Sequence, residues 1–339
     1  MKYNFGIVAC LGVVLLFFSC QKKAPEIIRN HNVGPALGTS YSFTYLSDKK
    51  LDFQKEIDSV FQVVNQSMST YISDSDISRI NQGDSTVVVD AMFKEVFELS
   101  TVIKDKTNGY FDPTVGVLVN AWGFGSETAI KMDSAKVDSL MQYVGLEKVQ
   151  ITENNQVVKE IPNIYFDFNA IAKGYAIDRL ARLMDNKGVE NYLLELGGEV
   201  VAKGENLIKN KPWIIGIDDP QIEEGRKLKL LIHMKDRALA SSGNYRKFRV
   251  DSETQEKYVH TVDPKTGFTK NGKTLAVNIL ANTCAEADAY ATAFMAMDLD
   301  DVFTLIPQED NLDAYIIYLN NKGEPKEFIT DGFKSLVLE

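Results

Sequence analysis

Residues 282–297 of this chain read NTCAEADAYATAFMAM, the most informative segment of the sequence. We predict a helix from Cys284 to Met297, because small residues recur there at helical spacing. One face of this helix carries six residues, which are Ala285, Asp288, Ala289, Thr292, Ala293 and Ala296. The face is small and apolar, so we expect it to be buried against the rest of the protein.

Asp288 and Thr292 lie one turn apart on that face. A buried carboxylate is costly without a cation or hydrogen-bond donors. A hard divalent cation accepts one carboxylate, a hydroxyl and a backbone carbonyl, with substrate phosphates completing its shell. In the structural alternative, Asp288 caps a loop and Thr292 bonds to a carbonyl of its own helix. The spacing by itself leaves both roles open.

Around this helix, strands and helices follow one another without the regular βαβ repeat of a parallel sheet. We therefore predict an α+β fold, in which a single intertwined domain combines mixed sheets and packed helices. Further helices are expected at 51–68, 76–81, 91–106 and 169–187. Strands are expected at 38–47, 164–168, 191–202, 213–218, 228–242, 256–262, 275–281 and 314–319.

The N-terminal segment is typical of an export signal. Phe5 to Phe18 is an apolar run that is too short to span a bilayer and follows a positive start. The junction Phe17-Phe18-Ser19-Cys20 resembles a bacterial lipobox, although an ordinary signal peptide that contains a cysteine is the alternative. We predict a signal peptide at 1–19, lipidation of Cys20, a tether at 20–35 and a folded domain at 36–339. The protein would then be an exported lipoprotein, anchored to a membrane and facing the periplasm.

Composition sets the broad class of the protein. The chain has 339 residues, of which 45% are apolar, and its net charge is −10. These values are typical of a globular protein rather than a disordered chain. The acidic balance argues against nucleic acid as the main partner, because a basic surface would be expected. Cys284 is the only cysteine of 36–339, so no disulfide can form within the folded part.

One motif matches a phosphate-binding loop in letters only. Residues 267–274 read GFTKNGKT, which fits the pattern GxxxxGK[ST]. A P-loop needs a strand before it and a helix after it, since the helix N-terminus holds the phosphates. Here a turn precedes the motif and the alternating sequence LAVNIL follows it. We therefore predict a loop between two strands.

Two further segments carry candidate chemistry. Asp167 to Tyr175 forms a strand-to-helix junction, where Lys173 and the helix N-terminus could hold an anion; a solvent-exposed Lys173 on a capped helix is the alternative. His260 lies in an alternating run that ends in a turn, and is the best candidate for a catalytic histidine. We interpret His233 as structural and place His31 in the tether. A lone histidine is more often structural than catalytic, so the presence of His260 alone does not establish a catalytic role.

These segments belong to an ordered series of motifs over residues 36–339 that resembles the ApbE family, the FAD:protein FMN transferases. The series includes 36–39 (ALGT), 68–71 (MSTY), 73–81 (SDSDISRIN), 109–112 (GYFD), 122–125 (WGFG), 167–178, 196–199 (LGGE), 241–245 (SSGNY), 260–267 (HTVDPKTG) and 285–292 (AEADAYAT). The family usually has Met where this chain has Leu37, and Thr where it has Ser241.

The resemblance implies a set of site residues. Mg2+ would be held by the carbonyl of Ala170 and the side chains of Asp288 and Thr292. His260 would act as the base or position the acceptor, and Asp288 would act in catalysis through the metal. Flavin contacts are implied at Leu37, Tyr71, Tyr110, Phe111, Asp112, Asp167, Lys173 and Thr261.

The implied reaction is Mg2+-dependent transfer of FMN from FAD to a Thr or Ser hydroxyl of an acceptor protein, with release of AMP. Implied acceptors are proteins with an FMN-binding domain, such as exported subunits of membrane redox complexes. Two alternatives remain at this point. One is a Mg2+-dependent FAD pyrophosphatase that gives FMN and AMP. The other is a non-enzymatic flavin-binding lipoprotein.

Overall fold

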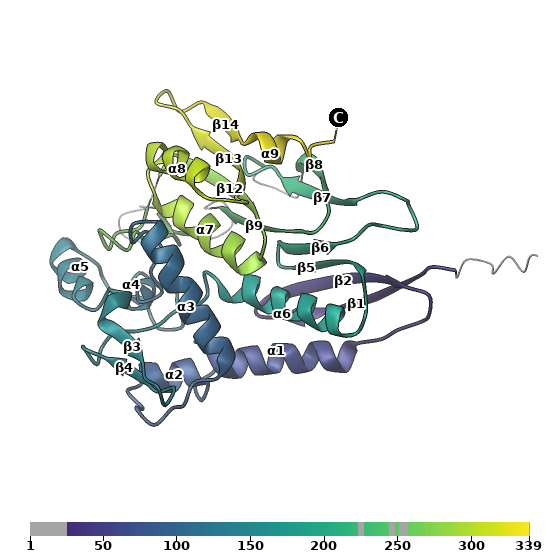
Figure 1. Cartoon of the computed structure of the whole chain (residues 1–339). Coiled ribbons are helices and arrows are strands. Elements are labelled where there is room, and N and C mark those ends of the chain that lie inside the picture. Colours follow the sequence, from purple (N-terminus) through teal and green to yellow (C-terminus); the bar gives the residue numbers. More distant parts are fainter. Residues whose placement is uncertain (1–25, 223–226, 244–247, 251–256, 271, 339) are drawn as a thin grey trace, which may run out of the picture.

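The computed structural model describes residues 26–222, 227–243, 248–250, 257–270 and 272–338 (Figure 1). The predicted signal peptide and Cys20 therefore lie outside the described residues, as do Asn244 and Tyr245. No helix in the described part of the chain is long and apolar enough to cross a membrane.

The centre of the molecule is an eight-stranded sheet with the order β1-β2-β5-β6-β9-β12-β13-β14. Each neighbouring pair in it is antiparallel, which is more regular than the mixed sheets we expected. Its strands are β1 (Ile28–Ala36), β2 (Thr39–Ser47), β5 (Asn191–Leu196), β6 (Glu199–Lys203), β9 (Arg237–Gly243), β12 (Thr274–Ala281), β13 (Asp313–Leu319) and β14 (Pro325–Ile329). Two-stranded sheets are formed by β3 (Val149–Ile151) with β4 (Val157–Lys159), β7 (Trp213–Asp218) with β8 (Leu228–Met234), and β10 (Phe248–Val250) with β11 (Lys257–Val259).

Most of the helices pack on one face of this sheet, which we call the helical face (Figure 1). Side chains of alternate strand residues reach it, such as Ala238 and Ala240 of β9, and join the largest core cluster. The prediction of an α+β fold is thus confirmed. The helices of the described chain are α1 (Gln54–Met68), α2 (Asp76–Asn81), α3 (Ala91–Lys106), α4 (Gly116–Ala121), α5 (Ser134–Met141), α6 (Ala172–Asn186), α7 (Cys284–Ala296), α8 (Leu299–Leu305) and α9 (Asp331–Lys334).

The opposite face of the sheet, the hairpin face, is partly covered by β7 and β8. Leu239 and Leu280 point to this side and share a second core cluster with Trp213 and Ile232. The chain end completes this layer, because the N–H of Leu338 donates to the carbonyl of Leu231 at 2.9 Å. The sheet therefore separates two cores.

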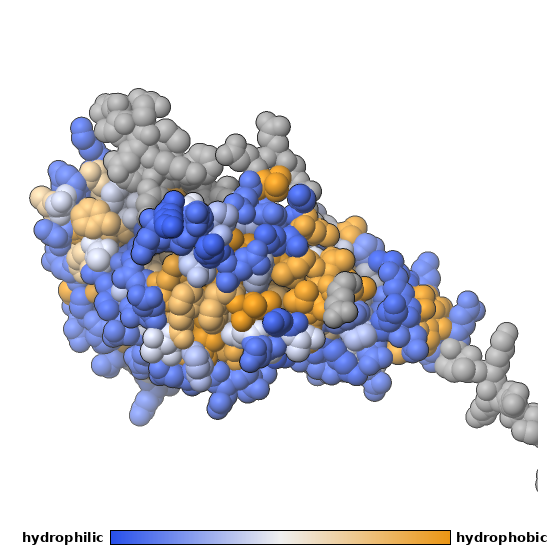
Figure 2. All heavy atoms as spheres, turned by 90° about the horizontal axis from the view of Figure 1, so that it is seen from above, coloured by the Kyte–Doolittle hydropathy of each residue, from blue (hydrophilic) through white to orange (hydrophobic). Residues whose placement is uncertain are grey.

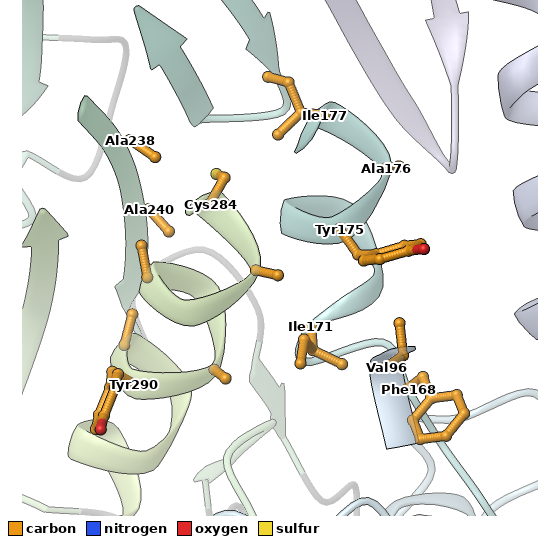
Figure 3. Packing of buried hydrophobic residues seen from close by; sticks show 14 of the residues in the cluster. Val96, Phe168, Ile171, Tyr175, Ala176, Ile177, Ala238, Ala240, Cys284 and Tyr290 are labelled. Atoms are coloured by element: carbon orange, nitrogen blue, oxygen red, sulfur yellow. The ribbon is translucent and has the colours of Figure 1, made fainter. Parts of the chain in front are cut away.

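Helix α7 is buried on nearly all sides rather than on the single face that we predicted. Only Glu286 and Thr292 of its residues escape full burial. Short alanine side chains let β9 and α6 approach it closely, and Figure 3 shows this packing. A reciprocal pair of hydrogen bonds between Thr283 and Glu286 caps its N-terminus.

The loop that resembles a P-loop has the structure predicted for it. Asp263 accepts the N–H of Gly267 at 2.8 Å in a turn, and strand β12 follows. The carbonyl of Gly267 accepts the indole N–H of Trp122 at 2.9 Å, so this turn is fixed to the α4 region.

The predicted end of the tether was wrong. The tether was expected to extend to Pro35, but residues from Ile28 onward form strand β1 and pair with β2. The asparagines of β1 are buried and hydrogen-bonded. Asn32 Oδ1 accepts the Tyr45 hydroxyl at 2.7 Å, and Asn30 Oδ1 accepts the N–H of Leu51 at 2.7 Å. A polar strand of this kind resembles a linker in sequence.

The predicted strand at 164–168 is an irregular extended segment. Only Tyr165 makes a bridge, to Val115. Side chains and loops take the place of a neighbouring strand, because Asn81 bonds both the N–H and the carbonyl of Phe166, and Asp167 N–H donates to the carbonyl of Pro113. Sequence cannot distinguish such side-chain pairing from a sheet.

Candidate active site

The N-terminal turns of α6 and α7 lie against each other, and a glycine permits the contact. A Cβ atom on Gly174 would lie 2.3 Å from the carbonyl oxygen of Cys284 and 2.9 Å from Cα of Ala285. The same residue donates its N–H to Asp288 Oδ2 at 3.1 Å. This close approach brings the two segments with candidate chemistry into one site.

Lys173 lies between two carboxylates. Its Nζ is 2.5 Å from Glu199 Oε1 and 3.9 Å from Asp288 Oδ2. Burial lowers the pKa of Lys173, but the charges of Asp288 and Glu199 outweigh this and raise it above its usual value. Lys173 is therefore a fixed positive charge. The alternative interpretation, in which Lys173 extends into solvent from a capped helix, is wrong.

Glu199 is a site residue that sequence reasoning did not assign. It follows the Gly197–Gly198 turn, is 2% exposed, and its Oε2 has no hydrogen-bond partner among the described residues. Burial raises its pKa to about 7, although Lys173 opposes this. The LGGE motif was visible in the sequence, but only the fold brings it to Lys173.

Asp178 is the second residue that sequence reasoning did not assign a role. Its two carboxylate oxygens accept the N–H groups of Cys284 and Ala285 at 2.9 and 2.8 Å, and so fix the N-terminus of α7 from α6. Burial raises its pKa to about 7 against these bonds. Asp178 stands one turn after Gly174, so helical spacing could have placed it on the face toward α7.

Asp288 has one oxygen available for a cation. It is 3% exposed, and hydrogen bonds from described residues reach only Oδ2. Burial raises its pKa, while Lys173 and the Gly174 N–H oppose the shift. The half-buried Thr292 is one turn along α7. No group of three or more His, Cys, Asp or Glu side chains that could hold a metal occurs in the described part, so a hard cation here would need hydroxyl and carbonyl ligands as well.

Residues 167–170 connect this site to Tyr71. Asp167 Oδ1 accepts the N–H of Asn169 at 2.7 Å, and Asn169 Nδ2 approaches the Thr70 hydroxyl at 3.4 Å. Burial and the charge of Asp167 raise the pKa of Tyr71, whose side chain is nevertheless 64% exposed. An exposed aromatic ring beside the junction that contains Ala170 could stack on a planar ligand.

The 110–112 segment divides into one accessible and two buried side chains. Lys265 Nζ lies 4.6 Å from the ring centroid of the partly buried Tyr110. Phe111 is 3% exposed and belongs to the main core. Asp112 uses its carboxylate to accept the Thr114 hydroxyl at 2.6 Å and the Leu146 N–H at 3.1 Å. Any ligand contact at Phe111 or Asp112 would therefore come from the backbone.

His260 and Thr261 directly follow β11. His260 is half-buried and Thr261 is 7% exposed. The carbonyl of Thr261 accepts the N–H of Lys270 at 2.8 Å, and Lys270 Nζ reaches Asp298 beyond the end of α7. The 260–270 segment is thus attached near the far end of the helix that carries Asp288.

Leu37 lies in the tight turn between β1 and β2 with a positive φ of 48°. The following Gly38 also has a positive φ, as in the turns that favour hairpins. The turn is near the site, since Thr39 contacts Gly197, whose added Cβ would lie 2.6 Å from Thr39 Cγ2. A leucine in this conformation is uncommon, and such strain is often found at binding sites.

This site is typical of one class of protein, an α+β protein in which a half-buried lysine and buried carboxylates meet at two helix N-termini. The arrangement suits phosphate groups together with a hard cation. The chain belongs to the ApbE family, whose family model matches residues 37–316. The family resemblance predicted from the sequence motifs is confirmed.

Named relatives match over nearly the whole chain. A protein of Vibrio cholerae serotype O1 named FAD:protein FMN transferase is 33% identical, over 96% of this chain and 97% of its own length. One of Haemophilus influenzae with the same name is 31% identical, over 99% and 98%. The solved structure "Flavin Transferase ApbE from Vibrio cholerae" superposes with a TM-score of 0.81 at 32% identity, over 92% of this chain and all of that one.

Proposed function

We propose that this protein transfers FMN from FAD to a Thr or Ser hydroxyl of an acceptor protein and releases AMP. The observation that carries the proposal is the cluster of Lys173, Glu199 and Asp288 at the junction of α6 and α7, which suits a pyrophosphate that binds together with a divalent cation. The names of full-length relatives support the same reaction. Acceptors would carry an FMN-binding domain, such as exported subunits of membrane redox complexes.

Mg2+ is proposed as the cofactor, held by the Ala170 carbonyl, the Asp288 carboxylate and the Thr292 hydroxyl. The free oxygen of Asp288 and the excess of buried carboxylate over lysine fit a divalent cation. Mg2+ prefers oxygen ligands and commonly shares its shell with substrate phosphates. When bound, it would offset negative charge on the pyrophosphate.

The reaction forms one P–O bond and breaks another. The acceptor hydroxyl oxygen bonds to the FMN-side phosphorus of FAD, the bond to the AMP-side oxygen breaks, and AMP leaves. Lys173 would bind the pyrophosphate and neutralise charge that develops on it. His260 would take the hydroxyl proton or position the acceptor, while Leu37, Tyr71, Tyr110 and Thr261 would hold the flavin.

The test is the mass of an acceptor protein after incubation with the full-length protein, FAD and MgCl2. We expect a gain of one FMN less one water, together with an equal amount of AMP, and loss of both products in EDTA. AMP and FMN without a gain in acceptor mass would contradict the transferase and indicate a pyrophosphatase. Bound FAD that remains intact would instead indicate a carrier.

A prediction at Leu37 tests the flavin pocket. We expect Leu37→Asn to weaken FAD binding about tenfold, because an apolar contact with the ring is lost. Unfolding by urea should shift by no more than about 1 kcal/mol, since asparagine tolerates the positive φ and offsets the lost packing. Fluorescence titration of FAD measures the affinity. Val33→Asn, at an exposed position of strand β1 before the turn, should leave the affinity unchanged. Equal affinities for the wild type and both variants would show that Leu37 does not contact the flavin.

We further propose that the protein is an exported lipoprotein, anchored through Cys20 and facing the periplasm. The apolar run before Ser19-Cys20 supports this location. Release of the whole protein with the soluble periplasmic fraction would contradict it.

A further inference from the structure

Large apolar side chains are exposed together on the segment that leads into the β7–β8 hairpin and on the hairpin itself. Leu207 is 41% exposed and Ile208 is 55% exposed. Three more exposed aliphatic side chains belong to the hairpin: Ile214, Leu228 and Leu231. Figure 2, seen from above, shows apolar residues gathered in a band that hydrophilic residues border. We call these five residues the aliphatic patch.

A defined turn holds the first part of the patch outward. The N–H of Asn206 donates to the carbonyl of Lys211 at 2.9 Å, and the N–H of Lys209 donates to the carbonyl of Asn206 at 3.0 Å. Asn210 adopts a positive φ of 48° to close the turn. Leu207 and Ile208 therefore project from an ordered backbone.

The hairpin extends the patch. Gly216 pairs with Leu231, and the space above Gly216 is filled by Leu228, because a Cβ on Gly216 would lie 2.6 Å from Leu228 Cδ2. Ile214 pairs with His233 on the same hairpin and borders one cavity together with Ile208. The apolar surface thus runs from the turn across the hairpin.

The aliphatic patch lies near the start of strand β1, which follows the N-terminal segment. Ile27 packs against the core cluster that contains Trp213 and Ile215 of β7. Arg29 and Ile208 line the same cavity of about 220 Å³. In Figure 1 the connection between β6 and β7 projects at the end of the molecule at which β1 begins. Seven residue steps from Cys20 to Ile27 span at most about 25 Å.

We propose that the aliphatic patch rests on the membrane surface to which Cys20 anchors the chain, with Leu207 and Ile208 inserted among the lipid headgroups. This inference rests on the lipid anchor proposed above and is independent of the transfer reaction. The segment from Cys20 to Ile27 is short, so a lipid attached to Cys20 would keep the bilayer close to the patch. An apolar or basic contact with the bilayer adds to the affinity that a lipid anchor supplies and fixes the orientation of the protein on it.

Charge favours lipid as the occupant of this surface. Lys209 and Lys211 flank the turn, are exposed, and enter no ion pair with another residue that the structure describes. The acid nearest in sequence, Glu205, is paired with Lys235 at 2.7 Å. In a chain of net charge −10, these two lysines beside exposed aliphatic side chains suit anionic headgroups.

The proposed contact also orients the active site. Lys173 and Asp288 belong to helices on the helical face of the sheet, whereas the patch is on the outside of the hairpin that covers the hairpin face. An acceptor would therefore approach from the side of the molecule turned away from the lipid.

The experiment uses the full-length lipidated protein in vesicles of phosphatidylethanolamine and phosphatidylglycerol, with brominated acyl chains as quencher. We expect the emission that Ile208→Trp adds over the wild type to fall by about half in the brominated vesicles. Val158→Trp is the control, because Val158 is 53% exposed on β4, far from β1 in Figure 1. Its added emission should not change. Lys209→Glu with Lys211→Glu in the Ile208→Trp protein should restore the emission.

Three outcomes would overturn the proposal. One is equal quenching of the two tryptophan variants on vesicles that carry the protein. Another is absence of quenching while the Ile208→Trp emission shifts with protein concentration, which would assign the patch to a second copy. The third is failure of the protein to float with the vesicles, which would contradict the proposed lipid anchor as well. FMN transfer measured in the same samples tests the proposed function separately.

Discussion

Asp288→Asn should reduce FMN transfer about 1,000-fold, because the variant loses the only carboxylate proposed to hold Mg2+. The side chain keeps its size, and the amide oxygen can still accept the N–H of Gly174. The geometry of α6 and α7 is therefore retained. The measurement is the rate of acceptor labelling at saturating FAD and MgCl2.

The same substitution should not lower the stability of the protein without metal. Burial raises the pKa of Asp288, so its ionised form is costly in the folded state, and Lys173 keeps Glu199 at 2.5 Å as its partner. We expect an equal or higher midpoint of urea unfolding. A structural role for Asp288 would instead lower the midpoint together with the activity.

Ligand-linked stability separates the two roles further. Addition of MgCl2 with ADP should raise the melting temperature of the wild type and leave that of Asp288→Asn unchanged. Asp300→Asn is the matched control, since it removes one negative charge from an exposed position of α8. It should behave as the wild type in both measurements. An equal rise in all three proteins would contradict the proposed metal site.

Gly174→Ala should destabilise the protein by about 2–3 kcal/mol, through overpacking of the contact between α6 and α7. The added Cβ would lie 2.3 Å from the carbonyl oxygen of Cys284, and its other close contacts are also backbone atoms, which cannot rotate away. Separation of the two helices would also lengthen the distance between Lys173 and Asp288. Transfer should therefore fall with stability.

A loss of stability in Gly174→Ala would be opposite to the usual effect of this substitution in a helix. Gly174 lies inside a helix, where replacement by alanine ordinarily adds about 1 kcal/mol of stability. Gly272→Ala is the control, because the nearest atom to its added Cβ is a lysine side-chain atom at 3.6 Å. Urea unfolding of both variants measures the difference. A Gly174→Ala protein as stable as the wild type would mean that the helices do not touch as described.

Local signals in the sequence predicted several elements well. Helix α3 begins and ends as predicted, since Asp90 accepts the N–H of Phe93 as its N-cap. Helix α2 follows the predicted cap region, with Ser75 as the cap. The helix that carries Asp288 and Thr292 was predicted to within one residue of its observed end. Each of these signals is confined to a few neighbouring residues.

Contacts between distant segments could not be obtained in this way. Asp178 caps a helix more than 100 residues later, and Glu199 meets Lys173 only because β6 and α6 pack together. The burial of Asn30 and Asn32 in β1 depends on partners in β2 and the loop after it. Their polarity alone indicated a tether.

The residue types and the local spacing of the site follow from the sequence: a carboxylate and a hydroxyl lie one turn apart, and a lysine stands at the start of a helix. That these residues meet, and which further side chains support them, follows from the packing of distant segments. Helical and strand periodicity act over a few residues, whereas the environment of a buried charge is set by every segment packed around it. In this protein a glycine without a Cβ allows that packing.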